Sequence, residues 1–207
     1  LAETGEDGER RTVAIELNLL IDVAIIGRPN VGKSQLLRDL SGAQVKVADY
    51  DFTTQEPARA VVESGWNTYV AAEMPGILSG ANQGKGLGSA SMKHMRRARV
   101  FLHVLDGTRD SLAADFSEVC EEICLYDRAL PEVPQLVVIN KVDLPDVRGR
   151  VEAAQAELDH AGVARHFVSA LTGEGVEDLA TGLYDLLAAQ PVKPRRAKEE
   201  EFATIRP

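Results

Sequence analysis

The sequence predicts an α/β protein: a three-layer, doubly wound and mostly parallel sheet of about six strands, one of them antiparallel. Three observations predict this fold class. Short apolar runs alternate with longer segments of helical periodicity from residue 22 to residue 190. The first apolar run leads through a glycine-containing loop directly into a helical segment. Two strand-like runs are joined only by Ser-Gly-Trp-Asn at 64–67, which is too short for a crossover helix, so that pair must be antiparallel.

The individual elements follow from apolar spacing. Runs rich in aliphatic and β-branched residues predict strands at 22–27, 58–63, 67–73, 99–105, 135–139 and 164–168. Apolar residues three and four positions apart predict helices at 33–41, 89–98, 112–128, 148–161 and 175–189. In such a fold, the loops that bind ligands lie at the carboxyl ends of the strands.

One domain is therefore expected over residues 22–190. Residues 1–21 are expected to be a linker or the remnant of a preceding domain. Within them, Thr12 to Leu17 alternates like a strand that pairs outside this chain or lies on its edge. Residues 191–207 are rich in charge and proline and are expected to form a flexible tail or linker.

Composition narrows the function classes. A hydrophobic content of 44% with 27% charged residues is typical of a soluble globular protein, and the net charge of −9 argues against a broad nucleic-acid-binding surface. No apolar run approaches the roughly 18 residues that span a bilayer. Cys120 and Cys124 are interpreted as packing residues in a reducing compartment. A local basic cluster is either a solvated helix face or a contact for RNA or another acidic partner: Lys93, Arg96, Arg97 and Arg99.

The loop at 27–34 reads Gly-Arg-Pro-Asn-Val-Gly-Lys-Ser, which fits the phosphate-binding pattern G-x-x-x-x-G-K-[S/T] between a strand and a helix. Its backbone N–H groups converge on an anion, and the helix N-terminus adds its positive dipole end. Lys33 is expected to reach the outer phosphates and the Ser34 hydroxyl to ligate Mg²⁺. The alternative is a glycine-containing loop that binds nothing. The predicted nucleotide contacts here are Gly27, Pro29, Asn30, Val31, Gly32, Lys33, Ser34 and Gln35.

A second motif names the base. Asn140-Lys141-Val142-Asp143 follows a buried strand. The Asp143 carboxylate offers two acceptors to the ring N–H and the exocyclic amine of guanine, and adenine presents no such pair of donors. Lys141 is expected to lay its stem along the base, and Asn140 to tie this loop to the phosphate loop. Taken alone, the motif is also compatible with a solvated turn. Ser169-Ala170-Leu171 supplies a third element, in which the N–H of Ala170 is expected to bind the guanine carbonyl.

Two loops are predicted to respond to the γ-phosphate. In the segment from Val47 to Pro57, Thr54 is expected to reach Mg²⁺ and the γ-phosphate, with Thr53 as the alternative. The second loop begins at residues 73–76, where Gly76 is expected to donate its N–H to the γ-phosphate. The glycine-rich stretch that follows is also compatible with a plain flexible connection.

Together these segments resemble the Obg GTPases over residues 10–190. The most restrictive elements are Ala-Asp-Tyr-Asp-Phe-Thr-Thr at 48–54, Met-Pro-Gly-Ile-Leu-Ser-Gly-Ala at 74–81 and Gly-Lys-Gly-Leu-Gly at 84–88. The phosphate loop, Val-Phe-Leu-His-Val-Leu-Asp at 100–106, the motif at 140–143 and Ser-Ala-Leu-Thr-Gly-Glu-Gly at 169–175 complete the set.

The resemblance implies a P-loop GTPase domain that hydrolyses GTP slowly as a molecular switch. It also implies a role in assembly of the large ribosomal subunit, with binding to that subunit, and responsiveness to guanosine tetraphosphate. The location implied is the cytoplasm of a bacterium or an organelle of bacterial origin. In the family a glycine-rich domain precedes the GTPase domain, so residues 1–21 would retain only its last strand. The residues implied in catalysis are Asn30, Lys33, Thr54 and Gly76, and those implied at Mg²⁺ are Ser34, Thr54 and Glu73.

The chain departs from the family pattern at several positions. Glu73 stands where Asp is usual, which would push the carboxylate about 1.5 Å further out. Gln35 replaces a hydroxyl residue, and Arg28 stands where an apolar residue is common. Ile77 occupies the place of the glutamine that orients water in Ras-like GTPases.

Two alternatives remain open in the sequence. Asn30 fits the family's K⁺-coordinating asparagine, or it serves only the turn after Pro29. The competing function is a nucleotide-gated binding module with negligible turnover, while an ATPase is disfavoured by Asp143.

Overall fold

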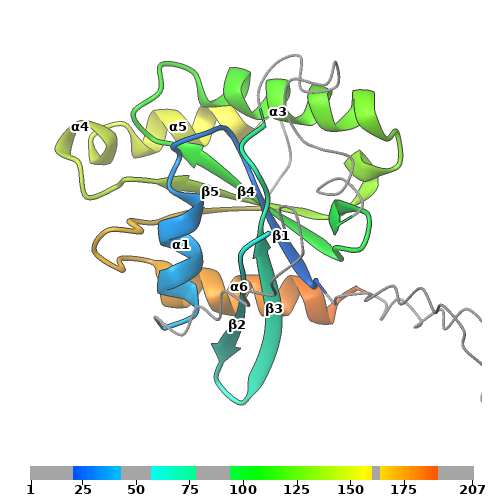
Figure 1. Cartoon of the computed structure of the whole chain (residues 1–207). Coiled ribbons are helices and arrows are strands. Elements are labelled where there is room, and N and C mark those ends of the chain that lie inside the picture. Colours follow the sequence, from blue (N-terminus) through cyan, green and yellow to red (C-terminus); the bar gives the residue numbers. More distant parts are fainter. Residues whose placement is uncertain (1–20, 43–56, 78–93, 160–163, 191–207) are drawn as a thin grey trace, which may run out of the picture.

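The computed structural model describes residues 21–42, 57–77, 94–159 and 164–190 (Figure 1). The strand expected around residues 12–17 and the tail at 191–207 lie outside these ranges, as do the first switch segment at 47–56 and the glycine-rich stretch from 78 onward. None of the helices in the described ranges is long and apolar enough to cross a bilayer.

The described residues form one six-stranded sheet, with the order β2-β3-β1-β4-β5-β6. Its strands are β1 (Val23–Ile26), β2 (Arg59–Ser64), β3 (Asn67–Glu73), β4 (Val100–Asp106), β5 (Gln135–Asn140) and β6 (Ala164–Phe167). Among these six strands only the β2–β3 pair is antiparallel, because its tight turn leaves no room for a crossover. The predicted α/β architecture, with its single antiparallel strand, is confirmed.

Helices cover both faces of this sheet (Figure 1). They are α1 (Lys33–Leu40), α3 (Leu112–Tyr126), α4 (Pro145–Arg148), α5 (Val151–Asp159), α6 (Val176–Ala188) and the short 3₁₀ helix η2 (Leu130–Glu132). Alternate residues of β1 explain the layers: Val23 and Ile25 pack with α1 and α6, whereas Ala24 and Ile26 pack with α3. All four residues of β1 are fully buried, as expected for a central parallel strand.

The main departure from the predicted elements lies between residues 145 and 161. One helix was expected at 148–161, but the chain forms α4 and then α5, with a break at 149–150. Pro145 stands at the start of α4, where its fixed φ favours a first turn, and Gly149 follows its last residue. Of the helix expected at 89–98, only residues 94–98 are described; 94 and 95 are helical, and the chain then turns.

The sheet brings the candidate site together at one edge. Parallel pairing places Glu73 beside Ile25, at the end of β1, and Asn140 beside Asp106, at the ends of β5 and β4. The loops that leave these strands therefore meet above the carboxyl edge, although they are far apart in the sequence.

Candidate nucleotide-binding site

The loop after β1 is shaped by residues with positive φ. Gly27 has φ +144° and Gly32 has φ +100°, and a Cβ on Gly32 would lie 2.3 Å from the side-chain nitrogen of Asn140. Asn30 also has a positive φ of 63°, a conformation that asparagine tolerates better than most residues. The backbone can adopt this shape only because glycine occupies the two tightest positions.

Lys33 lies inside the curve of this loop. Its Nζ donates to the carbonyl oxygens of Gly27 at 3.2 Å and Arg28 at 2.9 Å, and the residue is only 5% exposed. Burial lowers the pKa of Lys33, and the nearby Glu73 carboxylate partly opposes that shift. The ammonium group is thus held at the centre of the loop, where an anion cradled by the backbone would meet it.

Ser34 and Glu73 face each other at the first turn of α1 and the end of β3. The Ser34 hydroxyl donates to Oε1 of Glu73 at 2.7 Å, so the longer side chain at position 73 reaches the serine directly. A hydroxyl and a carboxylate are the oxygen ligands that Mg²⁺ prefers, and the pair fits that ion. The described residues contain no group of three or more His, Cys, Asp or Glu that could hold a metal ion by themselves.

The start of the second switch packs against the phosphate loop. A Cβ on Gly76 would lie 2.7 Å from the Pro29 ring, and the N–H of Ile77 donates to the Gly27 carbonyl at 3.0 Å. The Ile77 side chain is 1% exposed and belongs to the core beneath α3. Gly76 therefore lies where its backbone can approach a bound phosphate, while the Ile77 side chain faces the core.

Asn140 joins three loops through its side-chain amide. Its Nδ2 donates to the Val31 carbonyl at 2.9 Å, and its Oδ1 accepts from the N–H of Lys141 at 2.8 Å and of Ala170 at 2.9 Å. The first bond links the Asn-Lys-Val-Asp loop to the phosphate loop. The third links the loop of Ala170 to the Asn-Lys-Val-Asp loop, so the N–H expected to bind the guanine carbonyl lies beside Asn140.

The Asp143 carboxylate is held by a residue of the neighbouring loop. Ser169 donates its hydroxyl to Oδ1 of Asp143 at 2.6 Å, and the same Ser169 oxygen accepts from the N–H groups of Leu171 and Thr172. The Leu171 side chain is 79% exposed beside them. Asp143 is thus fixed in orientation before any ligand binds, which reduces the ordering cost of recognising a base.

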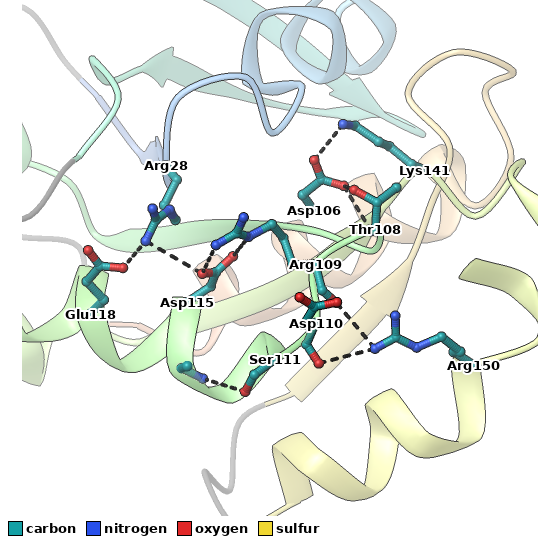
Figure 2. Close-up of polar contacts among 11 residues, drawn as sticks. Arg28, Asp106, Thr108, Arg109, Asp110, Ser111, Asp115, Glu118, Lys141 and Arg150 are labelled. Carbon is teal, nitrogen blue, oxygen red and sulfur yellow. Dashed lines mark hydrogen bonds and ion pairs between the residues drawn. The ribbon is translucent and has the colours of Figure 1, made fainter. Parts of the chain in front are cut away.

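Lys141 is positioned by Asp106, a residue that entered the sequence analysis only as part of the family resemblance. The Lys141 ammonium lies 2.5 Å from Oδ2 of Asp106, while Thr108 donates its N–H and hydroxyl to Oδ1 (Figure 2). Burial alone would raise the pKa of Asp106, but the hydrogen bonds from Lys141 and Thr108 outweigh it and hold that pKa below its usual value. The sequence carried one signal for this role of Asp106, which is an acidic residue at the end of a buried strand.

A second polar network, which sequence reasoning missed, joins the phosphate loop to α3. The Arg28 guanidinium contacts Glu118 and lies 3.6 Å from Oδ1 of Asp115, and Arg109 binds Asp115 at 3.0 and 3.4 Å (Figure 2). Ser111 caps the helix by accepting from the N–H of Ala114, which fixes the first turn that carries Asp115. Arg28, which departs from the family pattern, therefore has two acidic partners on α3.

The basic cluster noted in the sequence is largely engaged within the protein. Arg96 pairs with Asp127 at 2.7 Å, and Arg99 contacts Asp22 and donates to the Leu187 carbonyl at 2.7 Å. Lys93 lies outside the described residues. Arg96 and Arg99 therefore both have acidic partners within the protein.

Comparison with protein families agrees with this geometry. Residues 22–141, which contain the phosphate loop, the second-switch start and the beginning of the guanine motif, match the family model described as "50S ribosome-binding GTPase". The chain belongs to this family. The match covers more than half of the 207 residues and includes the strands that carry the site.

Curated relatives within the family carry the name GTPase Obg. That of Dehalococcoides mccartyi is 43% identical over 209 residues, spanning 100% of this chain and 49% of the relative. That of Roseiflexus castenholzii is 41% identical over 208 residues, spanning 99% and 47%. The resemblance to Obg GTPases is confirmed, and the chain spans about half the length of these relatives.

Solved structures support the fold of this family member. A mutant of S. thermophilus NFeoB bound to GDP matches with a TM-score of 0.60 at 22% identity, over 80% of this chain and 61% of that one. The cytosolic domain of the T. maritima FeoB iron transporter in apo form matches with a TM-score of 0.59 at 24% identity, over 82% and 64%.

Proposed function

We propose that this chain is a slow GTP-hydrolysing molecular switch of the Obg type that acts in assembly of the large ribosomal subunit. The observation that carries the proposal is the hydrogen bond from Asn140 to the Val31 carbonyl, which joins a guanine-type motif to a phosphate loop. One continuous surface can then bind the base and the phosphates of a single nucleotide.

Binding would use the two groups of residues in different ways. The loop from Gly27 to Ser34 offers backbone N–H groups, and Lys33, which donates to two carbonyl groups, would direct its third ammonium N–H to a phosphate oxygen. Asp143, already held by Ser169, would accept from the guanine ring and amine. Lys141, held by Asp106, would lie along the base.

Mg²⁺ would be held by Ser34 and Thr54 with Glu73 nearby, and would neutralise charge between the β- and γ-phosphates. Asn30 is in turn a candidate ligand for K⁺ beside the same phosphates. Because the Ser34 hydroxyl uses its proton to donate to Glu73, the lone pairs of its oxygen remain available to ligate a cation.

Hydrolysis replaces the bond between the γ-phosphorus and the bridging oxygen with a bond to water oxygen, giving GDP and phosphate. Lys33 and the N–H of Gly76 would stabilise the charge that develops on the transferring group. The buried Ile77 side chain offers no group to orient water. Turnover should therefore be slow, on the order of 10⁻⁴ to 10⁻³ s⁻¹ without a partner.

Single-turnover assays test the enzymatic part. Hydrolysis of GTP but not ATP at the expected rate supports it, with Lys33→Ala as the inactive control. Nucleotide binding without measurable turnover would instead support the binding-module alternative. Matched KCl and NaCl reactions test Asn30: the proposed K⁺ role requires faster hydrolysis in KCl and loss of that difference in Asn30→Ala.

The ribosomal part needs the full-length protein, because this chain spans half of its relatives. Co-sedimentation with large subunits should be stronger with a non-hydrolysable GTP analogue than with GDP, and nucleotide-independent binding would contradict a switch. Binding of guanosine tetraphosphate is expected at the same site as GDP, and calorimetric competition between the two measures it. The proposed location is the bacterial cytoplasm, or an organelle of bacterial origin.

A further inference from the structure

Asp115 is a buried carboxylate that two arginines share. Its side chain is only 7% exposed, and it accepts from Arg109 through both oxygens while Arg28 lies 3.6 Å away on the other side (Figure 2). A carboxylate this buried is stable as an anion only when it is paired. Its position on the first turn of α3 is fixed by the Ser111 cap.

Arg28 connects this carboxylate to the machinery of the phosphate loop. Its side chain is directed toward α3, where it contacts both Asp115 and Glu118, and its backbone carbonyl accepts from Lys33 Nζ at 2.9 Å. The adjacent Gly27 carbonyl accepts from Lys33 as well and from the N–H of Ile77. The orientation of the peptide groups that hold Lys33 therefore depends on where the Arg28 side chain is anchored.

We propose that Asp115 is a positioning residue for the outer phosphates, acting through Arg28 on the carbonyl groups that hold Lys33. This inference rests on the proposed nucleotide binding and adds to it a residue on α3 that touches no nucleotide. Glu118 supports Arg28 from the next turn of the helix. Arg109 holds the shared carboxylate in orientation through its two hydrogen bonds.

The proposal predicts an effect on nucleotides that carry a β-phosphate and no effect on binding of the guanine base. Lys33 is expected to serve the β- and γ-phosphates, so loss of its positioning should weaken GDP and GTP binding and spare GMP. A general loss of folding would lower the affinity for all three. The measurement is therefore the ratio of GDP to GMP affinity, by competition against a fluorescent GDP analogue, together with the ³¹P shift of the β-phosphate of bound GDP.

Asp115→Asn should lower that ratio about tenfold and move the ³¹P signal. Arg28→Met, which also removes the contact with Glu118, should lower the ratio at least as much, and the double variant should lose no more than Arg28→Met alone, because Asp115 acts through Arg28. Arg28→Lys should restore part of the ratio, since it keeps the charge without the planar fork. Asp159→Asn is the matched control: it removes an aspartate partner of Arg165 at the far end of α5 and should change neither readout.

Thermal unfolding identifies variants that fail to fold. If Asp115→Asn does not fold, Arg28→Met carries the same expectation from the loop side. Wild-type GDP-to-GMP ratios and ³¹P shifts in folded Asp115→Asn or Arg28→Met would overturn the positioning role. If the wild-type chain binds neither GDP nor GTP, the proposed function fails instead, so the two failures are distinct.

Discussion

The phosphate side and the base side of the site are built by different means. On the phosphate side, the main-chain shape of Gly27 and Gly32 forms the cradle, and Lys33 is held by carbonyl groups. On the base side, side chains hold side chains, as in the contacts of Asp143 with Ser169 and of Lys141 with Asp106. A main-chain cradle accepts any anion that fits, whereas side-chain donors and acceptors select one base. Specificity should therefore reside in the second region and general affinity in the first.

The largest expected effect tests selection on the base side. Replacing Asp143 with Asn puts a donor opposite the guanine amine, so GTP affinity should fall by about 2–5 kcal/mol, or tens- to thousands-fold. Xanthosine triphosphate, which carries a carbonyl there, should gain affinity relative to GTP. Calorimetry with both nucleotides measures this, and unchanged GTP affinity would contradict the guanine assignment.

The next effect concerns the point where the two sides touch. A Cβ on Gly32 would lie 2.3 Å from Asn140 at a φ of +100°, so Gly32→Ala should break the contact between Asn140 and Val31 and strain the loop. GDP affinity should fall by about 3 kcal/mol, near a hundredfold or more. Gly42→Ala is the control, because Gly42 also has a positive φ but faces open space. Equal GDP affinity in both variants would show that the loops are not coupled.

Beneath the phosphate side lies a buried histidine, in contrast to the paired groups of the base side. His103 is fully buried on β4, stacks on Phe116, and has no hydrogen-bond partner for either ring nitrogen among the described residues. Burial lowers the pKa of His103 from 6.5 to about 4; the Asp115 carboxylate opposes that shift, while the Lys33 charge adds to it. The folded state therefore keeps His103 neutral while the unfolded state takes up a proton below pH 6.5.

The contribution of His103 to the free energy of unfolding is fully present above pH 6.5 and is lost as the pH falls toward 4. The total loss is about 3 kcal/mol. His103→Leu should remove that share of the acid sensitivity. The free energy of unfolding of both proteins, measured by urea titration between pH 7 and pH 4, gives the difference. If the difference in unfolding free energy between the two proteins stays constant over this range, His103 takes up protons equally in the folded and unfolded states, and the expected pKa shift is wrong.

The smallest expected effect, that of Asp106→Asn, tests most directly whether a residue serves the base side or the phosphate side. Asp106→Asn removes the charge that holds Lys141, while the new side-chain oxygen can still accept from Thr108. GMP, GDP and GTP should all bind about fivefold more weakly, because Lys141 serves the base that they share. Equilibrium titration with the three nucleotides measures it. An effect that grows with the number of phosphates would assign Asp106 to the phosphate side instead.

The sequence by itself determined most of the architecture. The buried strand before Gly27, the strand before Asn140 and the tight turn at 64–67 are local patterns, and their physics acts within a few residues. Apolar spacing is enough to define the strands and most of the helices, and the phosphate loop needs glycine at positions that the motif itself specifies. The same reasoning missed α4 and began the next helix at 148, because the short turn that starts at Pro145 and ends before Gly149 left little trace in the apolar spacing.

Only the tertiary structure decided which polar groups meet. Lys141 finds Asp106 across 35 residues and Arg28 finds Glu118 across 90, because strand order brings the ends of β1, β4 and β5 to one edge. The engagement of the Ala170 N–H by Asn140 has the same origin. A charged side chain carries no local mark of its partner, since any carboxylate on the surface could serve. Partner choice follows from packing of the whole sheet, so a local motif does not specify it.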